Sequence, residues 1–218
     1  MKKKMCICLV LSVLFLVGCA TGGGNKKETT DLNKIEAIYI DHGSTNVHIK
    51  SVNQSQLEAS HSRLIIDQKQ GKKELSIKIK KSVFQIGPKL NFNKNLHVNI
   101  PKDYKGKIFI NGGSGNITSE GLETEHIEAT TKSGNISLEF ADFHSDVFAK
   151  TASGNVELLL HEKEEPDIQL TTKTASGQQS ISVPLSVKHG DKKGIEGKAG
   201  AGLYQVDIET ASGNITLQ

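Results

Sequence analysis

Apolar and polar residues alternate along much of this chain, and the alternation stops and restarts at a recurring tripeptide, Ser-Gly-Asn. Successive side chains of a β-strand point to opposite faces, so each alternating run predicts a short strand with one buried face. The four full copies of the tripeptide are Ser114-Gly115-Asn116, Ser133-Gly134-Asn135, Ser153-Gly154-Asn155 and Ser212-Gly213-Asn214. The pattern therefore predicts an all-β protein built from repeats.

The phase of the alternation predicts a sharp turn at each tripeptide. Around Ser133, for example, Ala129 and Ile127 stand four and six residues before the serine, and Ile136 and Leu138 stand three and five residues after it. The positions nearest to the serine on either side, Ala129 and Ile136, are seven residues apart, so an unbroken strand would point them to opposite faces. Glycine adopts positive φ freely and asparagine tolerates the left-handed region, so Gly-Asn can form a tight corner.

The copies recur at the length of one coil made of two short strands. With a degenerate copy at Ser176 included, the serines at 114, 133, 153 and 176 follow one another after 19, 20 and 23 residues, and a second degenerate copy surrounds Ser44. A fixed period predicts a β-solenoid, a β-helix-like stack whose coils lie about 4.8 Å apart and share one aliphatic interior. An antiparallel β-sandwich with Gly-Asn hairpin turns is the alternative, since the 36-residue step to Ser212 departs from the period.

Other segments fit the repeat less well. Clean alternation predicts strands in ELSIKIK (74–80) and LNFNKNLHVNIP (90–101), and the QGKK before the first predicts a hairpin loop. The glycine- and lysine-rich KHGDKKGIEGKAGAG (188–202) is predicted to be a loop.

Residues 1–18 predict a signal peptide, because three lysines precede an apolar run that is too short to span a bilayer comfortably as a helix. At the end of the apolar run, Leu16-Val17-Gly18-Cys19 resembles a lipobox, which implies cleavage before Cys19 and a lipid on its sulfur. Residues 19–34 are then a lipidated N-terminus with a flexible Gly-, Thr- and Lys-rich tether, and residues 35–218 form the repeat domain. An ordinary signal peptide and a buried apolar strand are the alternatives for the apolar run.

Removal of the signal peptide changes what the composition implies. Cys19 becomes the only cysteine, because Cys6 and Cys8 are removed, so no disulfide or thiolate metal site can form. The loss of three lysines lowers Lys plus Arg from 27 to 24, which balances the 24 Asp plus Glu, and a neutral domain gives no reason to expect nucleic acid as a partner. The single arginine, Arg63, against 26 lysines indicates an AT-rich genome and a Gram-positive host.

The repeats also resemble a known family. In LHVNIPKDYKGKIFINGGSGNI a strand ends in IPKD before the first full Ser-Gly-Asn unit, and the chain closes with GAGLYQVDIETASGNITL. Together with the lipobox, these features are similar to the bacterial putative-adhesin β-strand-repeat family, from about residue 35 to the end. The resemblance implies an exported or membrane-associated protein with a β-helix-like fold, and it supplies no catalytic residue to carry over.

A β-solenoid enzyme would need acidic side chains at matching outward positions of neighbouring coils. Five residues before the serine, the acidic residues are Glu128 and Asp207, which we expect to lie several coils apart. His42 and His48 form the one local histidine cluster, expected on opposite sides of a corner and solvated rather than metal-binding. The sequence contains no phosphate-binding glycine loop and no nucleophile elbow, so we predict no cofactor, no metal and no catalytic residue.

Three aromatic residues, Tyr39, Phe109 and Phe148, share the outward position five residues before the serine. They are candidates to contact a glycan or a protein partner, but we expect them instead to pack under a loop or against the strands of residues 50–107. Hydroxyl side chains also align, and we expect them to form hydrogen bonds along the stack. The aligned threonines are Thr131, Thr151, Thr174 and Thr210.

These observations predict a lipid-anchored surface protein on the extracytoplasmic side of a bacterial cell membrane. It would act through non-catalytic binding or as a cell-envelope scaffold, with an envelope glycan or a surface protein as its partner. An envelope-stress component that acts through a protein partner and a carbohydrate-active β-helix enzyme are the two alternatives.

Overall fold

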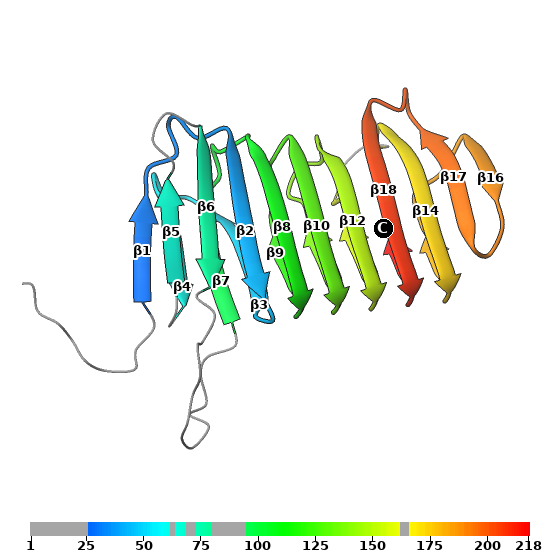
Figure 1. Ribbon diagram of the computed structural model, residues 1–218. Coiled ribbons are helices and arrows are strands. Elements are labelled where there is room, and N and C mark those ends of the chain that lie inside the picture. The colour runs from blue at the N-terminus through cyan, green and yellow to red at the C-terminus, as the bar shows by residue number, and fades with distance from the viewer. Residues whose placement is uncertain (1–25, 62–63, 69–72, 80–94, 162–165) are drawn as a thin grey trace, which may run out of the picture.

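The computed structural model describes residues 26–61, 64–68, 73–79, 95–161 and 166–218. Within these ranges the regular secondary structure consists of β-strands. The predicted signal peptide and Cys19 lie outside the described residues. In the described part of the chain no helix is long and apolar enough to cross a membrane. Figure 1 shows the strands stacked in two layers along one axis.

Two sheets form these layers, and each takes one strand from most coils (Figure 1). The nine-stranded sheet contains, in spatial order, β1 (Lys26–Thr30), β4 (Leu57–His61), β7 (Asn95–Pro101), β3 (Asn46–Val52), β9 (Ile117–Glu120), β11 (Ile136–Glu139), β13 (Val156–Leu159), β19 (Ile215–Leu217) and β15 (Gln179–Ile181). The ten-stranded sheet contains, in spatial order, β16 (Val187–Gly190), β17 (Gly194–Ala199), β14 (Ile168–Ser176), β18 (Tyr204–Ser212), β12 (Asp146–Ser153), β10 (His126–Ser133), β8 (Lys107–Ser114), β2 (Ala37–Gly43), β6 (Glu74–Ile79) and β5 (Leu64–Gln68).

Matching strands of neighbouring coils are parallel and in register, which confirms the β-solenoid. Ser133 is the register partner of both Ser114 and Ser153, and Ser212 is the partner of both Ser153 and Ser176. Among the described strands, antiparallel pairing is confined to the two ends of the stack. The antiparallel sandwich is therefore excluded.

The interior of the stack is a continuous column of aliphatic side chains from both sheets. The ten-stranded sheet contributes a row of residues that are at most 1% exposed, namely Ile38, Ile108, Ile127, Val147, Val206 and Leu170. The nine-stranded sheet contributes a facing row with the same low exposure, namely Val47, Ile117, Ile136, Val156 and Ile215. Each buried large aliphatic side chain stabilises the fold by about 1.5–3 kcal/mol, so the column holds the coils together without tryptophan.

The coils do not stack in the order of the sequence. β18 lies between β12 and β14, and β19 lies between β13 and β15, so the last coil is inserted beside the third full tripeptide. In the same way β2 lies between β6 and β8 at the other end. The 36-residue step to Ser212 thus contains the strands of the C-terminal end, after which the chain returns into the stack.

The two ends correct two expectations. The tether predicted for residues 19–34 is too long, because Lys26–Thr30 form β1, which pairs with β4, and Leu32 is buried. The loop predicted for residues 188–202 is also wrong, since β17 pairs with both β14 and β16 there. Its inward positions are Ile195, Gly197 and Ala199, and such small residues hid the alternation.

The other two predicted strands are present. β6 covers most of residues 74–80, and β7 covers residues 95–101, while residues 90–94 lie outside the described residues. β5 and β6 are antiparallel neighbours, as a hairpin requires, and the connecting residues 69–72 lie outside the described part.

Candidate functional site

At each Ser-Gly-Asn corner the glycine lies in close contact with the main chain of the next coil. Gly134 has a φ of 153°, and a Cβ at this position would collide with the carbonyl oxygen of Gly115. Gly154 and Gly213 repeat this arrangement, each against the glycine of its neighbouring coil. Both the backbone conformation and the close approach therefore require glycine.

The asparagines of the corners form a hydrogen-bonded ladder. The main-chain N–H of Asn135 donates to Asn116 Oδ1, that of Asn155 to Asn135 Oδ1, and that of Asn214 to Asn155 Oδ1, each at 2.9 Å. The ladder continues to Gln178, whose N–H donates to Asn214 Oδ1 at 2.9 Å. The expected left-handed backbone of these asparagines is wrong, because among the described residues the one non-glycine residue with positive φ is His161.

Aligned threonines donate hydrogen bonds to the corner glycines of the neighbouring coil. Thr151 Oγ1 donates to the carbonyl oxygen of Gly134 at 3.1 Å, and Thr210 Oγ1 donates to that of Gly154 at 3.0 Å. Both threonines are buried. These threonine hydroxyl groups therefore hold neighbouring coils together.

The aromatic residues lie together on the outer face of the ten-stranded sheet. The rings of Tyr39 and Phe109 stack with centroids 4.8 Å apart and planes 10° apart. The ring of His126 lies 5.4 Å from Phe109 and 5.5 Å from Phe148, tilted toward both. Tyr39 is 39% exposed and Phe148 is 36% exposed, so the expectation that a loop or other strands cover them is wrong. We call Tyr39, Phe109, His126 and Phe148 the aromatic row.

A carboxylate stands within the aromatic row. Glu128 is the register partner of Phe109 on β8 and of Phe148 on β12, and it follows His126 on the same face of β10. Its side chain is exposed and forms no hydrogen bond or ion pair with another described residue. Burial lowers the pKa of the neighbouring His126 and outweighs Asp146 and Glu128, which raise it, so the neutral imidazole is favoured at pH 7.

Acidic pairs are placed differently from what we expected. Glu128 and Asp207 are separated by one coil rather than several, with Phe148 between them, because β18 is inserted next to β12. The nine-stranded sheet brings Glu120 and Glu139 onto neighbouring coils. We missed this pair because we compared only the positions before each serine.

This second pair does not form an isolated acid–base couple. Lys50 Nζ lies 2.6 Å from Glu120 Oε2, and His161 Nε2 lies 3.5 Å from Glu139 Oε1. Each carboxylate therefore already has a basic partner.

The two histidines of the local cluster are separated by the corner, as expected, but the expectation that both are solvated is wrong for His42. His42 is fully buried, and its Nδ1–H donates to the carbonyl oxygen of Thr45 at 2.6 Å, while its Nε2 has no partner among the described residues. His48 instead stacks on His97 across β3 and β7, with ring centroids 5.1 Å apart. Within the described part of the chain no three His, Cys, Asp or Glu side chains are placed to hold a metal ion.

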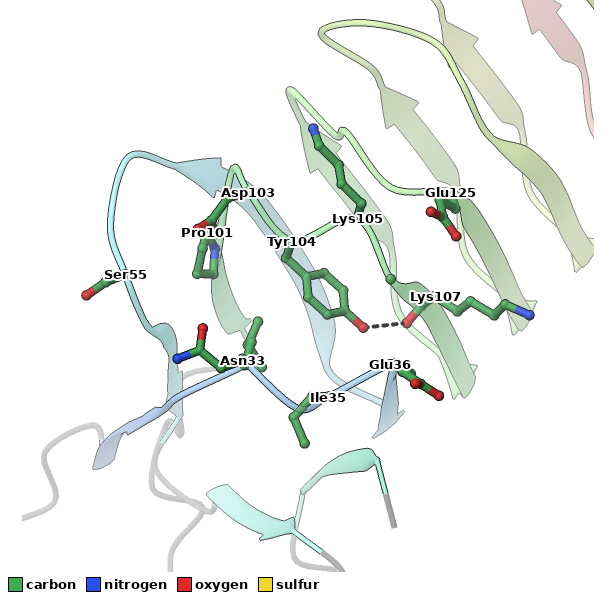
Figure 2. A pocket seen from close by; sticks show the side chains of 12 residues that line it. Asn33, Ile35, Glu36, Ser55, Pro101, Asp103, Tyr104, Lys105, Lys107 and Glu125 are labelled. Atoms are coloured by element: carbon green, nitrogen blue, oxygen red, sulfur yellow. Dashed lines mark hydrogen bonds between the residues drawn. The ribbon is translucent and has the colours of Figure 1, made fainter.

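A cavity of about 510 Å³ lies where the chain enters β2 and β8 (Figure 2). Tyr104 points across it and donates from its hydroxyl group to the carbonyl oxygen of Lys107 at 3.1 Å. Burial raises the pKa of Tyr104, so the phenol stays protonated. Two of the lining charges are paired outside the cavity, Glu36 with Lys73 and Lys105 with Glu123. Asp103, Lys107 and Glu125 also line the cavity. We take the aromatic row as the candidate site because it gathers exposed rings on one sheet face.

Comparison with a family profile decides the relationship. Residues 35–141 and residues 114–218 each match the Toastrack DUF4097 family, and the two matches together span the repeat domain. The chain belongs to the Toastrack family. The family resemblance inferred from the repeats is thereby confirmed, and the β-solenoid described above is the Toastrack fold.

A solved structure shares this Toastrack architecture. A "putative cell adhesion protein" from Clostridium sporogenes is 13% identical, with a TM-score of 0.61 over 88% of this chain and 97% of that chain. A "putative adhesin" from Bacteroides fragilis is 11% identical, with a TM-score of 0.35 over 90% of this chain and 98% of that chain. No curated protein matches this chain.

One member of the aromatic row was missed in the sequence. His126 stands seven residues before Ser133 rather than five, so it fell outside the position that we compared. A signal was available, since residues two apart on a Toastrack strand share one face, which places His126 beside Glu128.

Proposed function

We propose that this Toastrack protein is a lipid-anchored, extracytoplasmic surface protein that binds a partner without catalysis. The observation that carries this proposal is the aromatic row, which exposes large apolar rings on an outer sheet face. Family membership and the adhesion name of a protein of similar architecture support a binding role. The corners, by contrast, use their polar groups to hold the stack together.

The position of the fold relative to Cys19 supports an anchor. The first strand begins at Lys26, so seven residue steps join the proposed lipid site to the fold. A fully extended chain of this length spans at most about 25 Å, because each residue adds about 3.3–3.6 Å. The N-terminal end of the stack would therefore stay close to the membrane surface.

Two experiments test the two parts of the proposal separately. For the anchor, Cys19→Ala is expected to release the protein from the membrane fraction and to abolish incorporation of a labelled fatty acid. Unchanged membrane retention and unchanged labelling would contradict the lipid anchor.

For the binding role, the mature chain carrying Cys19→Ala is added to isolated cell envelopes and the retained fraction is measured. Replacing Tyr39 and Phe148 by serine is expected to lower retention by at least about tenfold, because exposed aromatic anchors dominate many binding interfaces. The matched control is Leu203→Ser, which removes an apolar side chain that is 67% exposed away from the aromatic row. Equal retention of both variants would exclude the aromatic row as the binding surface.

The non-catalytic part is tested with the same material. Cell-wall and capsular polysaccharides are incubated with the mature chain, and no release of reducing ends is expected. Release that disappears in Glu139→Gln would make the protein a carbohydrate-active enzyme instead.

A further inference from the structure

We propose that Glu128 and the rings of Phe109, His126 and Phe148 form a site for an arginine side chain of a partner protein. The inference rests on the proposed binding role of this face and names the chemistry of the partner. We call Glu128 with these three rings the arginine site.

The sheet register places the carboxylate between aromatic neighbours on both sides. Phe109 on β8 and Phe148 on β12 are the direct register partners of Glu128. His126 lies on the same strand and the same face, two residues earlier, and its ring contacts both phenylalanines. A group that binds Glu128 from solvent therefore lies beside aromatic rings.

Part of the Phe148 ring is open to solvent beside Glu128. Tyr39 stacks on Phe109 from the β2 side and His126 tilts toward Phe109 from β10, whereas Phe148 is 36% exposed and has His126 as its one ring neighbour among the described residues. A ring face carries the negative part of the aromatic quadrupole and attracts a cation within about 6 Å of the centroid. The exposed part of the Phe148 ring thus favours a positively charged group beside Glu128.

The charges around the site also favour a positively charged ligand. Glu128 has no counter-ion among the described residues, and Asp207 lies beyond Phe148 on the next coil, also without a described ion pair. The nearby Lys150 is already paired with Glu209 at 2.7 Å. The register partners of His126 are Lys107 on β8 and Asp146 on β12, so one cation and one further carboxylate flank the arginine site. The local balance is negative on a mature chain whose net charge is zero.

Among cations, a guanidinium group fits this arrangement best. It is planar and can stack on a ring face while it donates two parallel hydrogen bonds to one carboxylate. A neutral sugar would bury the Glu128 carboxylate without a compensating charge, which is costly. The stacking of Tyr39 on Phe109 also covers two ring faces on which sugars would otherwise pack.

The test uses a ten-residue peptide that alternates arginine with glycine, and a twin peptide with citrulline in place of each arginine. Binding to the mature chain carrying Cys19→Ala is measured by calorimetry at physiological salt. The arginine peptide is expected to bind at least about fivefold more tightly than the citrulline twin, since an exposed ion pair and a cation–π contact each contribute modestly. Glu128→Gln is expected to lower the affinity for the arginine peptide by a similar factor.

The matched control is Glu196→Gln, because Glu196 occupies the same outward row on β17 but has Thr171 and His189 as its register partners. This variant is expected to bind the arginine peptide like the unchanged chain. Equal affinity of the two glutamine variants, equal binding of the two peptides, or no binding of the arginine peptide would overturn the proposal.

A second variant distinguishes loss of binding from loss of folding. Phe148→Leu keeps an apolar side chain on the exposed strand but removes the ring, and it is expected to weaken the arginine peptide while leaving the melting curve nearly unchanged. Preferential binding of a neutral glycan that survives Glu128→Gln would also overturn the arginine site. It would leave the binding role of the aromatic row intact, so the two proposals fail separately.

Discussion

The side chain of Asn155 accepts a hydrogen bond at 2.9 Å from the main-chain N–H of Asn214, which follows it 59 residues later. The two residues occupy the same corner position on neighbouring coils. This bond shows that the last repeat is stacked on the third full one and that the coil around Ser176 lies outside it. The corners therefore carry the connections that fix the order of the coils.

Gly134→Ala is expected to destabilise the protein by more than about 1 kcal/mol, since a Cβ at positive φ is strained and would also strike the carbonyl oxygen of Gly115. Urea unfolding monitored by circular dichroism measures the loss. The control is Gly113→Ala, because a Cβ there would lie 3.4 Å from the Gly43 oxygen, an ordinary contact. Equal stability of the two variants would show that the corner is not built as described.

Asn135→Ala is expected to lower the free energy of unfolding by about 1 kcal/mol, because the N–H of Asn155 loses its acceptor. Asn135→Asp keeps an acceptor oxygen at that place and is expected to lose less at neutral pH. Thermal unfolding of both variants distinguishes the ladder from a simple effect of side-chain size. A larger loss for the aspartate than for the alanine would argue against the ladder.

Low pH is expected to destabilise the fold through His42. Burial lowers the pKa of this histidine below 6.5, although its bond to Thr45 and the nearby Asp41 act in the opposite direction. The unfolded chain therefore binds the proton more tightly, so this contribution to stability is complete above pH 6.5 and is lost as the pH falls through the lower folded-state value.

The measurement is the free energy of unfolding between about pH 7.5 and pH 5, the range in which histidines titrate. His42→Phe keeps a ring against Gly112 and is expected to flatten this dependence, whatever its effect on the stability itself. His189→Phe serves as the control, since His189 is exposed at the far end of the stack. An unchanged slope in His42→Phe would refute the role of His42.

Ile208→Ala is expected to cost about 2–5 kcal/mol, because Ile208 is 2% exposed in the inserted coil and its truncation leaves a cavity between two neighbouring coils. Leu203→Ala, one residue before the same strand and 67% exposed, is expected to change stability by less than about 0.5 kcal/mol. Calorimetric melting of the two variants gives the comparison. A small effect at Ile208 would mean that the last coil is not an interior one.

Much of the fold was predictable because the repeat registers with itself. The phase of Ile127 and Ile136 around Ser133 requires a corner, and the recurring spacing requires stacked coils. The order of the coils was not predictable, because the corners around Ser153, Ser176 and Ser212 are chemically alike and any of them can stack on another. β1 and β17 were missed for a different reason, since their polar or small residues give no apolar alternation.

The candidate site was predictable only in part. Tyr39, Phe109 and Phe148 share one position in the repeat, so their alignment on one face could be read from the sequence. Their exposure could not, because it depends on what the rest of the chain covers. The distance between Glu128 and Asp207 was misjudged because it follows from the insertion of β18.

The return of the chain into its own stack also affects how the protein is synthesised. Among the described strands β14 pairs with β17 and β18 but not with β12. The coil of β14 can therefore join the rest of the stack only after residues 204–218 have been made. Growth of the solenoid from one end, coil by coil behind the ribosome, is therefore impossible for this half of the molecule. The last segment to be synthesised, β18 and β19, must therefore enter the stack before the coil of β14 and β15 can add to it.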